Sequence, residues 1–210
     1  MKATVKRACR LHLWEILLLV GTMLFLSSGV FALQTQQELA EKVVRLHVLA
    51  NSDSEEDQAL KLQVRDAVLA HASYLLDGCE DRGDAESLLR GQLLELERMA
   101  LAVVRQAGYS YPVKLELADT EFPTRDYEGF TLPAGKYLAL RVLIGEAEGQ
   151  NWWCVVFPPL CAAASVDVPA AALAAGFEAE EVALITEDSP GYVLKFKTVE
   201  LWQTLRQNLA

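Results

Sequence analysis

Residues 136–144 read KYLALRVLI, and the alternation of their side chains predicts a β-strand. One face of this strand carries the side chains of Leu138, Leu140, Val142 and Ile144. The other face carries those of Tyr137, Ala139, Arg141 and Leu143. A polar stretch at 145–151 then predicts a hairpin loop that leads into the next strand.

That next strand, 152–157, reads WWCVVF and is apolar on both faces. A strand with one face in water would alternate, so the pattern predicts a central strand that is covered on both sides. We expect helices to cover one side, and the C-terminal segment is the candidate for the other. Pro158 and Pro159 cannot continue a central ladder and end the strand.

The chain before these strands predicts one more strand, two helices and a further strand. The stretch 43–49, VVRLHVL, is rich in β-branched residues and indicates the first strand. Two helices follow, the first capped by Ser54, the second capped by Asp84 and ended by Gly108. A strand at 113–117 completes the set. The order β-α-α-β-β-β indicates an α+β fold, a mainly antiparallel sheet with two helices on one face.

Changes in composition divide the chain into five segments. They are a signal peptide or N-terminal anchor (1–33), a polar tether (34–42), the α+β domain (43–161), an alanine-rich and acidic variable segment (162–191), and a C-terminal strand and helix (192–210).

The first segment has a basic start and an uncharged run from Ile16 to Leu33, which is the pattern of a secretory signal. Val30-Phe31-Ala32 is a suitable cleavage sequence. The run is also about as long as the shortest membrane-spanning helices, so an uncleaved anchor is the alternative. Both interpretations place the remaining residues outside the membrane.

The charge of the exported part limits its partners. Without residues 1–33, 15 of the 19 basic and 28 of the 29 acidic residues remain, which is a net charge of −13. Such a domain repels phosphate backbones and anionic lipid headgroups. We therefore expect no nucleic-acid partner, and membrane contact only through the N-terminal segment where it stays uncleaved.

Three of the four cysteines lie beyond the export segment, so at most one internal disulfide can form there. Cys154 and Cys161 are the closest pair in sequence. Their separation would be roughly 23 Å in an extended chain, whereas a disulfide holds the Cα atoms about 5.5 Å apart. Pro158 and Pro159 would have to turn the chain back. The alternative is two buried thiols.

The sequence contains no recognisable catalytic or metal-binding motif. Neither His47 nor His71 belongs to a paired metal motif. The stretch that starts at Asn51 lacks the glycine and the final glutamate of a calcium loop. We therefore expect no cofactor, no metal and no catalytic residue, and an interaction module rather than an enzyme.

Three longer stretches resemble one known family. They are RLHVLANSDSEEDQALKLQVRD (45–66), FPTRDYEGFTLPAGKY (122–137) and NWWCVVFPPLC (151–161). In content and order they are similar to the stage II sporulation protein R family of endospore-forming bacteria.

The resemblance implies a function that composition does not. Members of this family are made in the forespore and exported into the space between the forespore and mother-cell membranes, where they are free or anchored to the forespore membrane. There they activate a membrane-embedded aspartic protease of the mother cell, stage II sporulation protein GA. That protease processes the precursor of sigma-E. The resemblance thus implies an activating ligand whose catalytic partner is another chain.

Seven residues at strand ends are candidates for contact with that protease: Asn51, Ser52, Asp53, Asn151, Trp152, Pro158 and Pro159. An exposed aromatic or proline rim is a suitable contact for a protein partner. Helix capping and packing explain the same residues, and this alternative stays open.

Two other functions also stay open. The first is an exported hydrolase that acts on cell wall or peptides, which would require Asp53, His47 and another carboxylate to converge. The second is a membrane-anchored structural protein of the sporulation septum, which would require an uncleaved first segment.

Overall fold

The computed structural model describes residues 13–127, 129–160 and 167–186, and it confirms the α+β class. Four strands form an open, mainly antiparallel sheet in the order β2-β5-β1-β6. These strands are β1 (Val44–Leu49), β2 (Val113–Phe122), β5 (Gly135–Ile144) and β6 (Asn151–Phe157). β1 and β5 are parallel, and the two outer pairs are antiparallel. A separate hairpin consists of β3 (Arg125–Tyr127) and β4 (Phe130–Leu132).

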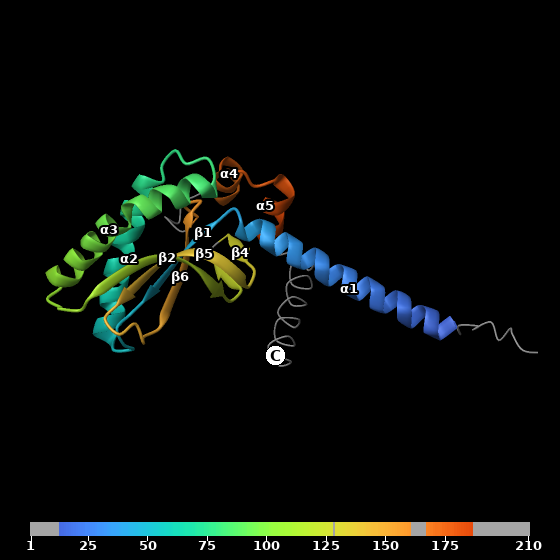
Figure 1. Ribbon diagram of the computed structural model, residues 1–210, viewed down its shortest axis with the longest axis horizontal. Helices are drawn as coiled ribbons and strands as arrows, with labels where there is room; N and C mark the ends of the chain where they lie inside the picture. Colours follow the sequence, from blue (N-terminus) through green and yellow to red (C-terminus); the bar gives the residue numbers. More distant parts are fainter. Residues whose placement is uncertain (1–12, 128, 161–166, 187–210) are drawn as a thin grey trace, which may run out of the picture.

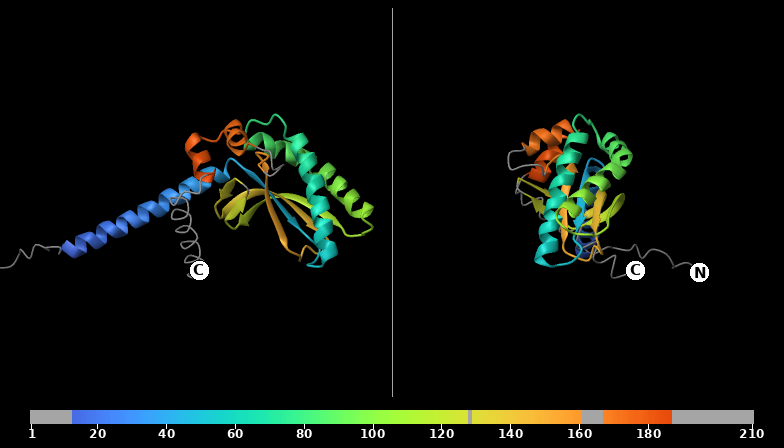
Figure 2. Two further views of the ribbon diagram at one scale, coloured as in Figure 1. Left: turned by 180° about the vertical axis from the view of Figure 1, so that it is seen from behind. Right: turned by 90° about the vertical axis from the view of Figure 1, so that its left-hand side faces the viewer.

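Two long helices, α2 (Glu55–Leu75) and α3 (Arg82–Gln106), cover one face of the sheet (Figures 1 and 2). The predicted cap of α2 is confirmed, because Oγ of Ser54 accepts a hydrogen bond from the backbone N–H of Asp57 at 3.2 Å. The predicted cap of α3 is wrong by three residues. Asp81 caps this helix by accepting from the N–H of Asp84 at 3.0 Å, so Asp84 lies in the first turn, where the helix dipole favours it. Gly108, with φ of +88°, follows the helix end as predicted.

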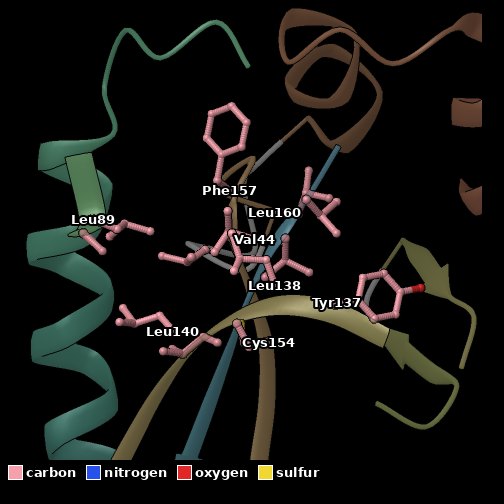
Figure 3. Close-up of a cluster of buried hydrophobic side chains, with 14 of the residues drawn as sticks. Val44, Leu89, Tyr137, Leu138, Leu140, Cys154, Phe157 and Leu160 are labelled. Atoms are coloured by element: carbon pink, nitrogen blue, oxygen red, sulfur yellow. The ribbon is translucent and has the colours of Figure 1, made fainter. Parts of the chain in front are cut away.

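The main core lies between these helices and the sheet. The helices contribute side chains at helical spacing, namely Leu60, Val64, Val68, Leu89, Leu96 and Val104. The sheet contributes alternate residues of its two central strands, which pair side by side as Leu46 with Leu140 and Val48 with Val142. Figure 3 shows Leu89 and Leu140 approaching each other in this core, whereas Tyr137 points the opposite way, toward the hairpin. The sheet therefore buries side chains on both faces.

The predicted central position of strand 152–157 is wrong. This segment is β6, which pairs with β1 and lies at the edge of the four-stranded sheet among the described residues. Apolar residues on both faces predict that the strand is covered above and below. They do not show how many strands bond to it within the sheet, because hydrogen bonding and face packing run in perpendicular directions.

The first helix, α1 (Leu13–Ala40), extends away from the domain in Figure 1. Its last turns replace the polar tether expected at 34–42. Leu39 is fully buried, Ala40 and Gln36 are buried as well, and the Arg82 guanidinium donates to the Ala40 carbonyl oxygen at 3.4 Å. The end of α1 is thus part of the domain. Among the described residues, no helix has the length and the apolar character that crossing a membrane requires.

Two short helices, α4 (Val168–Ala174) and α5 (Ala179–Thr186), form part of the segment predicted to be variable. Asp167 caps α4 by accepting from the N–H of Ala170 at 3.1 Å. α5 is tied to the end of α1 by an ion pair of 2.6 Å between Lys42 and Glu181. The predicted C-terminal strand and helix, 192–210, lie outside the described residues.

Candidate functional site

The predicted contact residues Asn51 and Ser52 lie in the loop between β1 and α2, and their side chains hold the start of the helix. The Asn51 amide and the Ser52 hydroxyl donate to the same carboxylate oxygen of Asp57, at 2.8 Å and 2.6 Å. These bonds, most strongly the one from Ser52, hold the pKa of Asp57 below its usual value. Both polar groups are therefore used by the fold.

The same loop is bonded to the loop between β5 and β6. Oδ1 of the Asn51 side chain accepts a hydrogen bond from the backbone N–H of Glu146 at 3.1 Å. The side chain of Asp53 accepts a hydrogen bond from the backbone N–H of Gln150 at 2.7 Å, and Asp53 is exposed. Gly149 packs so closely on this loop that a Cβ atom there would overlap the backbone carbonyl of Ser52. The two loops form one rigid end of the sheet, which we call the loop end.

A buried lysine supports the loop end from α2. Nζ of Lys61 donates to the Gln150 carbonyl oxygen at 2.9 Å, and only 4% of the residue is exposed. Burial lowers its pKa, and the nearby charge of Asp53 opposes that shift. Lys61 therefore acts as a donor to the backbone of this loop.

Asn151 and Trp152 begin β6 at the loop end, and both are exposed. Oδ1 of Asn151 lies 2.7 Å from Nε2 of His47. The Trp152 ring, 36% exposed, lies against α2, with the guanidinium of Arg65 4.1 Å from its centroid. An exposed, oriented tryptophan of this kind suits contact with another protein.

Pro158 and Pro159 lie at the opposite end of β6. Pro158 is buried and Pro159 is exposed. Residues 153–157 of the strand separate these prolines from Trp152, so the predicted contact residues form two sites rather than one. The loop end holds Asn51, Ser52, Asp53, Asn151 and Trp152.

Only the first cysteine of the predicted disulfide lies within the described residues. Cys154 is buried in β6 with 3% exposure, and Cys161 lies outside the described residues. The pairing stays a prediction.

The sequence did not predict a cluster around Arg45, on the sheet face opposite α2 and α3. Arg45 is fully buried, and its guanidinium lies 4.0 Å from the ring centroid of Phe122 and 4.9 Å from that of Tyr137. It donates to the Tyr127 hydroxyl of the hairpin and, at 3.5 Å, to the Cys154 carbonyl oxygen. Neither of these acceptors is a carboxylate. Aromatic faces and neutral oxygens therefore stabilise the charge.

His47 continues this cluster toward the loop end. Its imidazole stacks on the Trp153 indole with centroids 3.8 Å apart, and Phe122 meets that indole edge to face at 4.6 Å. Burial lowers the pKa of His47, the bond to Asn151 raises it, and the charge of Arg141 lowers it. Neutral imidazole is therefore favoured.

These contacts bear on the hydrolase alternative. His47 bonds to an amide, whereas Asp53 bonds to a backbone N–H in the loop end. The convergence of His47, Asp53 and a further carboxylate, which this alternative requires, is not found among the described residues. In the part of the chain that the structure describes, no group of His, Cys, Asp and Glu side chains is arranged to hold a metal ion.

The Arg45 cluster joins the three stretches that carry the family resemblance. Arg45 and His47 come from 45–66, the rings of Phe122, Tyr127 and Tyr137 come from 122–137, and Trp153 comes from 151–161. Residues 40–167 match the family profile described as stage II sporulation protein R, which is more than half of the chain. The chain belongs to the stage II sporulation protein R family.

A relative supports the same assignment. The chain is 31% identical over 160 residues to stage II sporulation protein R of Bacillus subtilis (strain 168), which covers 75% of this chain and 71% of that protein. No solved structure matches the chain. The family match includes every residue of the loop end and of the Arg45 cluster. Membership of this family gives the chain a role in sporulation.

One signal in the sequence could have indicated the Arg45 cluster. Arg45 and His47 stand at alternate positions in an otherwise apolar strand, so both had to lie on one sheet face. Strand neighbours on that face could not be assigned without the strand order, because Phe122 and Trp153 are far away in sequence.

Proposed function

We propose that this chain is the exported sporulation signal through which the forespore activates the mother-cell membrane aspartic protease, stage II sporulation protein GA. The protease then processes the sigma-E precursor. Membership of the stage II sporulation protein R family carries this proposal. The chain is a ligand in this scheme, and the protease supplies the catalytic aspartates.

The geometry supports a ligand that presents a preformed surface. The loop end is held by side-chain bonds from Asn51, Ser52, Asp53 and Lys61, so its exposed groups are fixed before any partner arrives. Preorganised groups lose less entropy on binding. Trp152 is the large exposed ring at this end, and we propose it as the central contact with the protease.

The site of action follows from the export segment. We propose that the domain works in the space between the forespore and mother-cell membranes. There it is either released by cleavage after Ala32 or held by residues 1–33 in the forespore membrane. N-terminal sequencing of the mature chain distinguishes these two states. A chain that starts at Leu33 is released, and one that starts at Met1 is anchored.

Reconstitution in a non-sporulating host tests the function. The host expresses stage II sporulation protein GA and the sigma-E precursor, with or without this chain, and precursor length is followed on a blot. We expect cleavage only when the chain is present with its export segment. A version that lacks residues 1–33 is the matched control and leaves the precursor intact. An uncleaved precursor, with the full chain shown to be folded and exported, would contradict the proposal.

A further inference from the structure

β2 lies at the other edge of the four-stranded sheet, and in the described part of the chain it pairs only with β5. It is ten residues long and contains no proline, so each of its residues has both a backbone N–H and a C=O group. An unpaired edge of this length is a template for a further strand, and native proteins usually block such edges. The partners of its backbone groups therefore indicate whether β2 can accept one.

α3 blocks this edge at one position. Backbone groups along an antiparallel strand point alternately toward the neighbouring strand and away from it. The Pro112 carbonyl oxygen accepts from the N–H of Gly145 at 2.9 Å, so the even-numbered residues that follow direct their backbone groups toward β5. The odd-numbered residues direct theirs outward, and the N–H of Leu115 donates to Oε2 of Glu97 on α3 at 2.9 Å. The edge is therefore closed at Leu115.

The second half of the edge is open. The odd-numbered residues that direct backbone groups outward here are Leu117, Asp119 and Glu121. No described residue bonds to these outward groups. Asp119 and Glu121 are exposed, and the intervening side chains of Ala118 and Thr120 are small. A strand placed beside this segment would therefore find a donor and an acceptor at each of the three residues without displacing a large side chain.

The charges beside the open segment favour an uncharged occupant. The Lys136 ammonium group lies 3.1 Å from the Asp119 carboxylate, and Lys136 is also the register partner of Glu121. These carboxylates share a cation already, so little charge is left for a partner to neutralise. A second copy of this chain is disfavoured, because the antiparallel register that uses the whole segment sets the two Asp119 carboxylates opposite each other. The occupant that fits is an uncharged strand of another protein.

Leu93 of α3 supplies the apolar part of this surface. α3 and β2 are joined by the short loop 107–112 and run in opposite directions. Leu93 lies one turn, about 6 Å, before Glu97, and Leu117 lies about 7 Å beyond Leu115. Because Glu97 bonds to Leu115, Leu93 is at the level of Leu117. It is half-buried, so a partner side chain opposite Leu117 would cover apolar surface that is still exposed.

We propose that residues 117–121 of β2 bind an extended, uncharged segment of a partner protein as an added antiparallel strand. Antiparallel pairs are more stable per residue than parallel ones. The partner residues opposite Leu117, Asp119 and Glu121 exchange both backbone bonds with them and place their side chains on the same sheet face, toward α3. The residues that donate are therefore the apolar residues of the segment. Stage II sporulation protein GA as the partner rests on the proposed function, whereas strand addition does not.

Strand addition is tested with the peptide acetyl-TVTVTVT amide, whose valines take the positions toward α3. One version carries N-methyl groups on two valines and another carries them on two threonines, so each blocks one edge of the same peptide. Full-length chain in detergent micelles is titrated with each peptide, and the backbone N–H signals of Asp119 and Glu121 are followed by nitrogen-15 NMR. The parent and threonine-methylated peptides should bind alike and slow hydrogen exchange at both amides, whereas the valine-methylated peptide should bind about tenfold more weakly.

A substitution in β2 tests the same bonds from the other side. Asp119→Pro removes one outward N–H and leaves the bonds to β5 in place, a change that edge strands tolerate. It should abolish peptide binding. Asp119→Ala is the matched control, because it loses the same carboxylate but keeps the N–H, and it should bind as the unsubstituted chain does. Circular dichroism checks the fold of both, and Glu121→Pro with Glu121→Ala replaces the pair where Asp119→Pro does not fold.

Equal binding of the two methylated peptides overturns the proposal, and so does equal binding by Asp119→Pro and Asp119→Ala. Tighter binding of the valine-methylated peptide overturns the antiparallel arrangement. No binding of any peptide to the folded chain would also overturn it, and would mean that the charges on this edge only keep it unpaired. Failure of the unsubstituted chain to activate the protease would count against the proposed function alone, and the peptide titration would still decide the strand site.

Discussion

The imidazole of His47 lies flat on the indole of Trp153, with centroids 3.8 Å apart and planes 14° apart. The two residues are register partners on β1 and β6, and Asn151 holds the far nitrogen of the imidazole. This stack connects the loop end, where the exposed residues lie, to the buried Arg45 cluster. It is therefore the place where pH should act on both.

Burial keeps the pKa of His47 below its ordinary value of 6.5. Asn151→Ala removes a bond that raises this pKa, so the pKa should fall further, and Arg141→Gln removes a nearby charge and should raise it. When the pKa of a histidine is lower in the folded state than in the unfolded state, the folded protein loses stability as the pH falls below the unfolded-state pKa. NMR titration of the imidazole measures the pKa, and urea unfolding at about pH 7.5 and about pH 5.5 measures the stability. A rise of the pKa in Asn151→Ala would contradict the assignment.

Asn51→Ala should lower the free energy of unfolding by about 1–3 kcal/mol, because Asp57 and the N–H of Glu146 each lose a partner. Pro159→Ala is the control, since Pro159 is exposed, and its effect should stay within about 0.5 kcal/mol. Chemical denaturation compares the two variants. Equal stability would show that the bonds of Asn51 are replaced by water.

Trp152 and Trp153 offer a matched pair of adjacent residues with opposite expected effects. Trp153→Ala removes a ring packed on His47 and Phe122 and should cost about 3 kcal/mol of stability. Trp152→Ala removes an exposed ring over Arg65 and should cost about 1 kcal/mol, yet abolish activation of the protease. Thermal unfolding and precursor cleavage are measured on both. Normal activation by Trp152→Ala would remove this residue from the proposed contact.

Arg45→Lys should be more destabilising than Arg45→Met, although lysine is the closer chemical relative. Lysine keeps a buried charge but loses the planar stacking on Phe122 and the fork that reaches Tyr127, whereas methionine removes the charge. We expect a loss of about 3 kcal/mol for lysine and about half of that for methionine. Denaturant unfolding of both variants gives the order. The reverse order would indicate that the charge itself stabilises the fold.

Local patterns predicted the elements, and long-range pairing could not be predicted in the same way. The alternation in 136–144 and the Ser54 cap are properties of neighbouring residues, and both are confirmed. The edge position of β6 depends on which strand lies beside it, which side-chain periodicity does not encode. The placement of Asn151 and Trp152 at the same end as Asn51 follows from the antiparallel pairing of β1 with β6. The Arg45 cluster needs three distant segments to be folded before its contacts exist.

The buried end of α1 has a mechanical consequence. From Leu13 to Gln36 the helix rises about 35 Å, and the chain enters the core without any slack. A contact that holds the start of this helix therefore fixes both the distance of the domain from that contact and the orientation of the domain. The loop end would then occupy a narrow range of positions, whereas a flexible linker would allow a wide one. Two glycines inserted between α1 and the core would widen that range while leaving every contact surface unchanged.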